Sequence, residues 1–289
     1  MKIAFVTNPR HPDMEDDDRP LAEALARRGA LVVAASWDEE GFDWSRVDLA
    51  LIRSPWDYYR RYAEFLTWLD ATAARTRVVN PPDVLKWNAN KRYIAEIAAM
   101  GVHTVPTVFV KRGEVRKIED ICVAQKWSTV VLKPAISADS WETIRVEPKS
   151  YAEGQAYLDR HRDHREIMVQ PFVKDVEIGS EQCLVWFGGE YSHAVTKNSA
   201  FKGGRHVGPE GRLIEPGNGS IEFAHDLLSR AEALDLPYAR VDIARDDDGR
   251  PMLLELELFE PTLFFLEKPG CEDRLADILI ATRPSGPHS

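Results

Sequence analysis

The sequence predicts a mixed α/β fold, with a parallel sheet at the amino terminus followed by two α+β regions. Short apolar runs alternate with amphipathic helical segments over residues 2–80, which is typical of parallel α/β units. Hairpin signals dominate residues 177–258. The chain has 289 residues, 44% of them hydrophobic, which is enough for about two domains and a sizeable core.

The amino-terminal region is expected to contain four strands, at residues 2–7, 30–35, 47–52 and 77–80. The pattern between them predicts one helix that ends at Gly29 and a second with Tyr62, Phe65 and Leu69 on one face. Ligands of parallel sheets bind beyond the carboxyl ends of the strands. We therefore expect the polar loops 8–18 and 53–58 to lie at a binding edge.

Helices and antiparallel strands are expected in the rest of the chain. Apolar runs predict strands at residues 105–110, 128–133, 167–173, 177–187 and 191–196, with Gly188-Gly189 as a hairpin turn. Helical periodicity predicts helices at residues 90–100, 118–125, 151–160, 221–234 and 275–280.

Composition excludes several classes of protein. The 37 Lys and Arg residues against 47 Asp and Glu give a net charge of −10, which disfavours a nucleic-acid-binding protein. No apolar run reaches the length of about 18 residues that a membrane helix needs, so no membrane partner is expected. Three widely spaced cysteines form neither a disulfide framework nor a zinc motif, and we expect a cytoplasmic protein. The oligomeric state stays open, with a homo-oligomer as one alternative.

The most informative segment is residues 239–258, where Asp248-Gly249 separates two runs of alternating residues. This pair predicts a two-residue hairpin turn, which places Asp242 opposite Glu255 and Arg240 opposite Glu257 on one face. The other face is apolar and is expected to point to the core: Val241, Ile243, Leu254, Leu256 and Leu258. Carboxylates this close repel one another, and Mg²⁺ prefers such oxygen ligands. The hairpin therefore favours a magnesium site over a solvated polar face.

Lysines at the ends of predicted elements are candidates for binding phosphate. Lys91 opens a helix, Lys133 ends a buried strand, and Lys197 ends another. The loop 135–143 after Lys133 offers backbone N–H groups and the hydroxyls of Ser137, Ser140 and Thr143 to an anion. It is not a Walker loop, because it lacks Gly-Lys-Ser/Thr.

Taken in order, these residues resemble the motifs of the ATP-grasp superfamily over residues 87–265. The motif residues are Lys91, Lys133, Gln170, Pro171, Phe172, Val173, Glu177, Lys197, Arg240, Asp242, Glu255 and Glu257. The resemblance implies a preATP-grasp substrate domain at residues 1–86 and two ATP-grasp subdomains, at 87–173 and 174–289, that clasp ATP. Glu257 departs from the family, where Asn is commonest, and loop 135–143 lacks the family's glycines.

The resemblance also implies roles for these residues. Lys91 and Lys133 would bind the ATP phosphates and Lys197 the γ-phosphate. The backbone of residues 170–173 would recognise adenine, and Glu177 would bind the ribose hydroxyls. Asp242, Glu255 and Glu257 would bind two Mg²⁺ ions, and Arg240 would stabilise charge on the transferred phosphoryl group.

Within the superfamily the chain is similar to a glutathione-synthetase-like group that includes the O-ureido-serine cyclo-ligase of D-cycloserine biosynthesis. The matching segments are Arg53–Tyr58, Asn80-Pro81, Trp87–Lys91 and Pro106-Thr107. The resemblance implies a carboxylate–nitrogen ligase that forms an acylphosphate on a small amino-acid-like substrate. Ring closure of O-ureido-D-serine, an intermolecular dipeptide-type ligation and a non-catalytic ATP-binding module stay open as alternatives.

Four residues are candidates for binding that substrate: Arg53, Asp57, Asn198 and Arg205. Arg53 would clamp a carboxylate through two parallel hydrogen bonds, and Asp57 would bind an ammonium group. The alternative is a surface ion pair at the end of a strand. For the glycine-rich segment 203–208 two interpretations stay open, a lid that excludes water and a plain surface loop.

Overall fold

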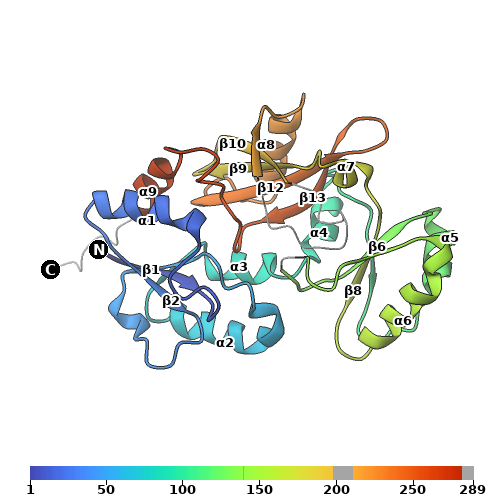
Figure 1. Ribbon diagram of the computed structural model, residues 1–289, viewed down its shortest axis with the longest axis horizontal. Coiled ribbons are helices and arrows are strands. Elements are labelled where there is room, and N and C mark those ends of the chain that lie inside the picture. Colours follow the sequence, from blue (N-terminus) through green and yellow to red (C-terminus); the bar gives the residue numbers. More distant parts are fainter. Residues whose placement is uncertain (139, 198–210, 282–289) are drawn as a thin grey trace.

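The computed structural model describes residues 1–138, 140–197 and 211–281, and their strands form three sheets (Figure 1). One sheet is parallel and two are antiparallel, so the predicted α/β fold class is confirmed. Asn198, Arg205 and the segment 203–208 lie outside the described residues. None of the helices in the described part is long and apolar enough to cross a membrane.

The first sheet contains the four predicted parallel strands. They are β1 (Lys2–Thr7), β2 (Leu31–Ser36), β3 (Leu49–Ile52) and β4 (Arg77–Val79), in the order β2-β1-β3-β4. Helix α1 (Arg19–Arg27) packs against one face and α2 (Tyr62–Ala73) against the other. The central strands β1 and β3 are almost entirely apolar because both of their faces are buried.

The second sheet contains β5 (Val108–Val110), β6 (Val130–Pro134), β7 (Ile144–Val146) and β8 (Ile167–Pro171), in the order β5-β8-β6-β7. All its pairs are antiparallel. Helices α5 (Ile118–Gln125) and α6 (Tyr151–His161) pack on the sheet, on the right of Figure 1. The short strand β7 was not predicted, because the sequence pattern indicated only a loop followed by a helix.

The third sheet has the order β11-β10-β9-β12-β13. Its strands are β9 (Gln182–Phe187), β10 (Glu190–Lys197), β11 (Gly211–Ile214), β12 (Tyr238–Arg245) and β13 (Pro251–Glu257). Helices α7 (Lys174–Ile178), α8 (Ser220–Arg230) and α9 (Glu272–Ala281) accompany it. The predicted strand at 177–187 starts too early, because α7 and a turn at Gly179 precede β9. Strand β11 was also missed.

Gly188 and Gly189 form the turn predicted between β9 and β10. Both have positive φ angles, 57° and 76°, which suit the primed turns that join twisted strands. A Cβ atom on Gly189 would also lie 2.6 Å from the carbonyl oxygen of Leu234, so glycine is required there for space as well.

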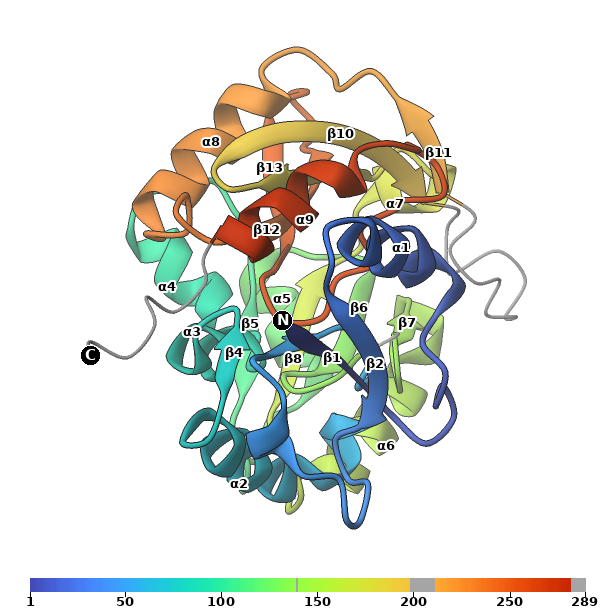
Figure 2. The ribbon, with the colours of Figure 1, turned by 90° about the vertical axis from the view of Figure 1, so that its left-hand side faces the viewer.

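The first and third sheets share one hydrophobic core. Side chains of β1, β3 and α1 pack with side chains of β9 and α9 in this core. Figure 2 shows α9 beside α1, and Arg28 joins them through ion pairs to Asp273 and Asp277 at 2.8 and 2.6 Å. The amino-terminal region therefore packs directly on the carboxyl-terminal sheet.

Strand β13 is at the edge of its sheet, and the backbone of residues 103–105 bonds its outer side at Leu253. Side chains from α3 (Pro82–Asn88) and α4 (Tyr93–Ala99) bond the outer side at its carboxyl end. The Asn88 amide donates to the Leu256 carbonyl at 2.8 Å and accepts from the Leu258 N–H at 2.7 Å. The Tyr93 hydroxyl accepts from the Leu256 N–H at 3.0 Å. Helix α3 was not predicted, because Pro81-Pro82 was interpreted only as the end of a strand, although proline is favourable in a first helical turn.

We predict that Asn88→Ala lowers the free energy of unfolding by about 2–4 kcal/mol, because it leaves two buried backbone groups of β13 without partners. Urea denaturation would measure the change. The matched control is Asn218→Ala, at an exposed position, which should change the free energy by less than about 0.5 kcal/mol. Equal effects of the two substitutions would contradict the anchoring role of Asn88.

Candidate active site

The β12–β13 hairpin places its charged residues in the predicted register. Arg240 lies opposite Glu257, and Asp242 lies opposite Glu255. Each of these side chains is buried or partly buried. The hairpin therefore brings three carboxylates and one guanidinium together at one face of the sheet, as the alternation of the sequence predicts.

The turn of this hairpin differs from the prediction. Arg245 pairs with Pro251, and the Asp246 N–H donates to the Arg250 carbonyl at 3.0 Å, so the turn is wider than Asp248-Gly249 alone. A bulge at Leu254 then shifts the ladder by one residue and restores the register at Glu255. Leu254 was predicted on the core face, and that prediction is wrong, since Leu254 lines a cavity.

Arg240 binds two of the three carboxylates. Its guanidinium donates two hydrogen bonds to Asp242, at 2.8 and 2.9 Å, and a further one to Glu257. Burial disfavours the ionised form of Asp242, but Arg240 and Lys197 more than offset it and hold the pKa of Asp242 below its ordinary value. At Glu257 the effect of burial is larger than the attraction of Arg240, so the pKa of that carboxyl rises to about 7. Glu257 is thus the acid of this pair that more readily takes up a proton.

Lys91 pairs with the third carboxylate. Its ammonium lies 3.0 Å from Glu255 Oε1 and donates to the Ser137 carbonyl at 2.6 Å. Burial disfavours both charges, but their attraction lowers the pKa of Glu255 and raises the pKa of Lys91. The two groups therefore stay charged together.

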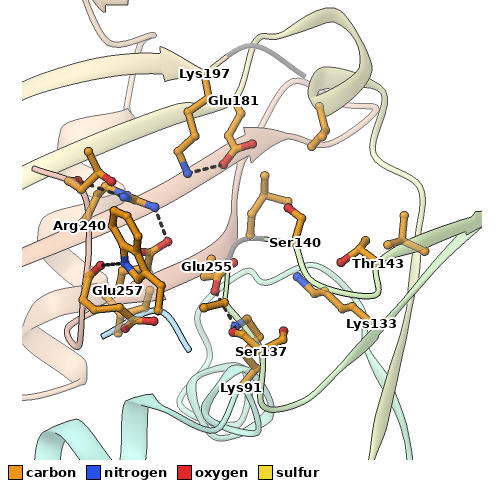
Figure 3. Close-up of a pocket in the computed structure, with 18 of the residues that line it drawn as sticks. Lys91, Lys133, Ser137, Ser140, Thr143, Glu181, Lys197, Arg240, Glu255 and Glu257 are labelled. Carbon is orange, nitrogen blue, oxygen red and sulfur yellow. Dashed lines mark hydrogen bonds and ion pairs between the residues drawn. The ribbon is translucent and has the colours of Figure 1, made fainter. Parts of the chain in front are cut away.

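Lys197, at the end of β10, bridges two acids. Its ammonium lies 2.7 Å from Asp242 Oδ2. It also lies 3.4 Å from Glu181 Oε1, a contact drawn in Figure 3. Burial raises the pKa of Glu181 although Lys197 attracts its charge. Glu181 precedes β9, and it was not among the predicted site residues.

Lys133 differs from the other cations because it has no ion-pair or hydrogen-bond partner for its ammonium among the residues that the structure describes. Figure 3 shows its side chain pointing into the cavity towards Glu255. Burial lowers the pKa of Lys133, and the attraction of Glu255 only partly offsets this. An anion bound beside Lys133 would satisfy an ammonium that the described protein groups leave unpaired.

These groups line one cavity of about 610 Å³. Most predicted site residues lie in its wall: Lys91, Lys133, Ser137, Ser140, Thr143, Gln170, Pro171, Phe172, Val173, Lys197, Arg240, Glu255 and Glu257. Asp242 is buried beneath the wall and contacts it through Arg240 and Lys197. The cavity also reaches the amino-terminal loops that were expected at a binding edge.

Glu177 does not line the cavity. It lies on α7, where its side chain is 51% exposed and pairs with Arg145 at 2.8 Å. The helical turn of α7 and the left-handed Gly179 that follows carry the chain away before it returns at Glu181. The carboxylate on this wall of the cavity is therefore Glu181, four residues after the predicted one.

Arg53 and Asp57 do not line the cavity either, in contrast to their predicted contact with substrate. Arg53 is 2% exposed, pairs with Asp18 at 2.7 Å and donates to the Pro261 carbonyl at 3.0 Å. Asp57 accepts a hydrogen bond from the Trp37 indole at 2.9 Å. Arg53 thus holds the backbone of a cavity segment through Nη2 and binds Asp18 through Nε, while Nη1 is buried without a hydrogen-bond partner among the described residues.

Several cavity residues were not singled out in the sequence: Arg10, His11, Glu15, Trp56, Tyr58, Glu181, Glu260 and Thr262. Five of them belong to loops 8–18 and 53–58, which were predicted at a binding edge, although only Arg53 and Asp57 were named there as substrate contacts. Glu260 lies three residues after Glu257 in the sequence, but it breaks the alternation of Glu255 and Glu257, so the pattern did not place it on the same face.

Comparisons with known proteins relate the chain to one group of enzymes. Residues 3–80 match the family model described as D-cycloserine synthetase DcsG, N-terminal domain. The cycloserine biosynthesis protein DcsG of Streptomyces lavendulae is 31% identical over 283 residues, which cover 90% of this chain and 92% of the relative.

Solved structures agree with this relationship. The crystal structure of D-cycloserine synthetase DcsG has a TM-score of 0.90 and 29% identity, and the match covers 98% of this chain and all of the other. The ATP-grasp ligase PsnB, solved with a precursor variant, Mg and ADP, has a TM-score of 0.65 and 16% identity, with 98% of each chain covered. The chain therefore has the ATP-grasp fold.

We predict opposite effects on stability for the two buried lysines of the cavity. Lys91→Met leaves Glu255 without its partner and should lower the free energy of unfolding by about 3 kcal/mol. Lys133→Met removes a partly buried charge that has no partner among the described residues, so the free energy should stay unchanged or rise. Urea denaturation without nucleotide would measure both. A larger loss for Lys133→Met than for Lys91→Met would contradict this assignment.

Proposed function

The chain belongs to the D-cycloserine synthetase family of ATP-grasp enzymes, and from this membership we propose that it closes the ring of O-ureido-D-serine to give D-cycloserine. It is an ATP-dependent ligase that forms a carbon–nitrogen bond. The observation that supports the proposal most is the composition of the cavity. Lys91, Lys133, Lys197 and Arg240 converge there with several carboxylates, beside loops of the amino-terminal region. We also propose that the enzyme works in the cytoplasm.

We propose that ATP occupies the part of the cavity between the second and third sheets. The backbone of residues 170–173 would bind adenine, and Glu181 would accept hydrogen bonds from the ribose in place of Glu177. Lys91, Lys133 and Lys197 would bind the phosphates, together with the hydroxyls of loop 135–143. The unpaired ammonium of Lys133 supports this placement, because a phosphate would supply its missing partner.

Asp242, Glu255 and Glu257 would hold Mg²⁺, and we propose two ions. The donor set fits this metal, since it consists of carboxylate oxygens gathered on one rigid hairpin. Bound Mg²⁺ would neutralise charge that develops on the phosphates. The raised pKa of Glu257 fits as well, because a carboxylate that is costly to ionise gains most from a nearby cation.

The reaction would begin with attack of the substrate carboxylate on the γ-phosphorus of ATP. The bond from the γ-phosphorus to the bridging oxygen breaks, ADP leaves, and an acylphosphate forms. Arg240, Lys91 and Lys197 would stabilise the charge on the transferred group, which is the main task of a phosphoryl-transfer catalyst.

Ring closure would follow on the same molecule. The nitrogen bound to the side-chain oxygen attacks the acyl carbon, phosphate leaves, and a five-membered ring forms. The ring nitrogen still carries its carbamoyl group, which must be lost to water as carbon dioxide and ammonia to give D-cycloserine. The nucleophile needs no second binding site, because it is already tethered to the acyl group.

We predict that the enzyme releases ADP when it is supplied with MgATP and O-ureido-D-serine, and that mass spectrometry detects D-cycloserine. Glu255→Gln should reduce ADP release by at least about 100-fold, because a carboxylate that would hold Mg²⁺ is lost. ATP binding without ADP release from any ureido, aminooxy or ordinary amino acid would support the non-catalytic alternative. ADP release that requires a second amino acid would support an intermolecular ligase.

We further predict that Glu181→Gln raises the KM for ATP by about 10-fold, because one charge-assisted hydrogen bond to the ribose is lost. The matched variant Glu177→Gln changes an exposed carboxylate outside the cavity and should leave this KM within about 2-fold. The two KM values would be measured at saturating amino acid. A larger effect at Glu177 would restore the assignment made from the sequence.

A further inference from the structure

Glu260 is the one carboxylate of the cavity wall without a cationic partner among the residues that the structure describes. Five glutamates line the cavity, and four of them have a partner within 4.0 Å. Glu15 pairs with His11, Glu181 with Lys197, Glu255 with Lys91, and Glu257 with Arg240. A cation that pairs with the Glu260 carboxylate would therefore have to come from a bound ligand and not from the residues that the structure describes.

The backbone around Glu260 is fixed by three side chains from different parts of the fold. The Trp56 indole donates to the Glu260 carbonyl at 3.3 Å, and Arg53 donates to the Pro261 carbonyl at 3.0 Å. Arg240 donates to the Thr262 carbonyl, also at 3.0 Å. A segment held at three consecutive carbonyls is preorganised, so its carboxylate is presented to the cavity in a defined place.

The surroundings of Glu260 favour an incoming cation strongly. Burial raises the pKa of Glu260 to about 8, and the neighbouring charges of Glu257 and Glu255 add to this, while Lys91 offsets part of it. A cation placed against the carboxylate would relieve both the repulsion and the cost of burial. The ring of Trp56 also lines the cavity, and an indole face attracts cations.

Glu260 lines the cavity beside the proposed phosphoryl-transfer site, where it interacts with the charges of Glu257, Glu255 and Lys91. The α-ammonium is attached to the carbon next to the carboxyl group, so it must lie close to the phosphoryl-transfer site. Glu260 follows Glu257 by three residues, and its segment is bonded to Arg240. Resting on the function proposed above, we propose that Glu260 binds the α-ammonium group of the substrate and thereby selects α-amino acids.

The test compares O-ureido-serine with the analogue that lacks only the α-amino group. For each, kcat/KM is measured by ADP release in the unaltered enzyme, in Glu260→Gln and in the surface control Glu222→Gln. The ratio of the two kcat/KM values should favour the amino compound by about 10- to 100-fold in the unaltered enzyme and the control, the effect of one charge-assisted contact. In Glu260→Gln the two kcat/KM values should differ by less than about 3-fold, and the KM for ATP should stay unchanged.

Stability measurements separate this role from a structural one. Glu260 has no cationic partner among the described residues, so Glu260→Gln should leave the melting temperature unchanged or raise it. Glu260→Asp keeps the charge but withdraws it by one methylene group, and it should give an intermediate ratio. Intermediate discrimination by this variant would support the proposal even if Glu260→Gln folded poorly.

The outcomes distinguish the two proposals. Turnover by the unaltered enzyme with a ratio that Glu260→Gln leaves unchanged would overturn the ammonium assignment alone. A changed dependence on Mg²⁺ in Glu260→Gln, with the ratio retained, would also overturn it, in favour of a metal-binding role. Absence of turnover of either compound by the unaltered enzyme would overturn the proposed function and this inference with it.

Discussion

The charge balance of the cavity depends on the guanidinium of Arg240. It binds both oxygens of Asp242, contacts Glu257 and donates to the Thr262 carbonyl. Without it, two buried acids on neighbouring strands would repel each other, and a buried carboxylate left without a partner costs several kcal/mol. One planar group with five donors can satisfy all three neighbours at once, which a lysine ammonium could not do in the same geometry. Two of the three proposed metal ligands, Asp242 and Glu257, and one end of the Glu260 segment are thus held by the same side chain.

The hairpin that carries these groups also needs support from the first half of the chain. Strand β13 is at the edge of its sheet, where backbone groups lack a neighbouring strand. Asn88 and Tyr93 supply hydrogen bonds at Leu256, and the backbone of residues 103–105 supplies them at Leu253. The buried pair of Arg53 and Asp18 holds the segment that follows. The first half of the chain therefore has two roles. Its loops line the cavity, and its side chains hold the backbone of β13, which carries Glu255 and Glu257.

Much of the end of the cavity where we propose that phosphate binds could be predicted, because local patterns define it. The alternation of residues 240–257 gave the correct register although the turn was wrong, since the wider turn and the bulge at Leu254 shift the ladder in opposite directions. Lys91 and Lys133 followed from their places at the ends of elements. Glu177 was wrongly placed in the cavity because spacing alone does not reveal the turn at Gly179. Arg53 was misassigned because its partner lies 35 residues earlier in the chain.

The substrate end could not be predicted in the same way, because it is assembled from three irregular segments near residues 10–15, 56–58 and 260–262. The last segment is held through its carbonyl oxygens, which every amino acid possesses, while its side chains are free to face the cavity. A substitution at Glu260 can therefore change the chemistry offered to a substrate and leave the backbone path intact. A change at Arg53 or Arg240 would move that path itself. This separation would let one phosphoryl-transfer centre serve different substrates, because the groups that hold the segment differ from those that meet the ligand.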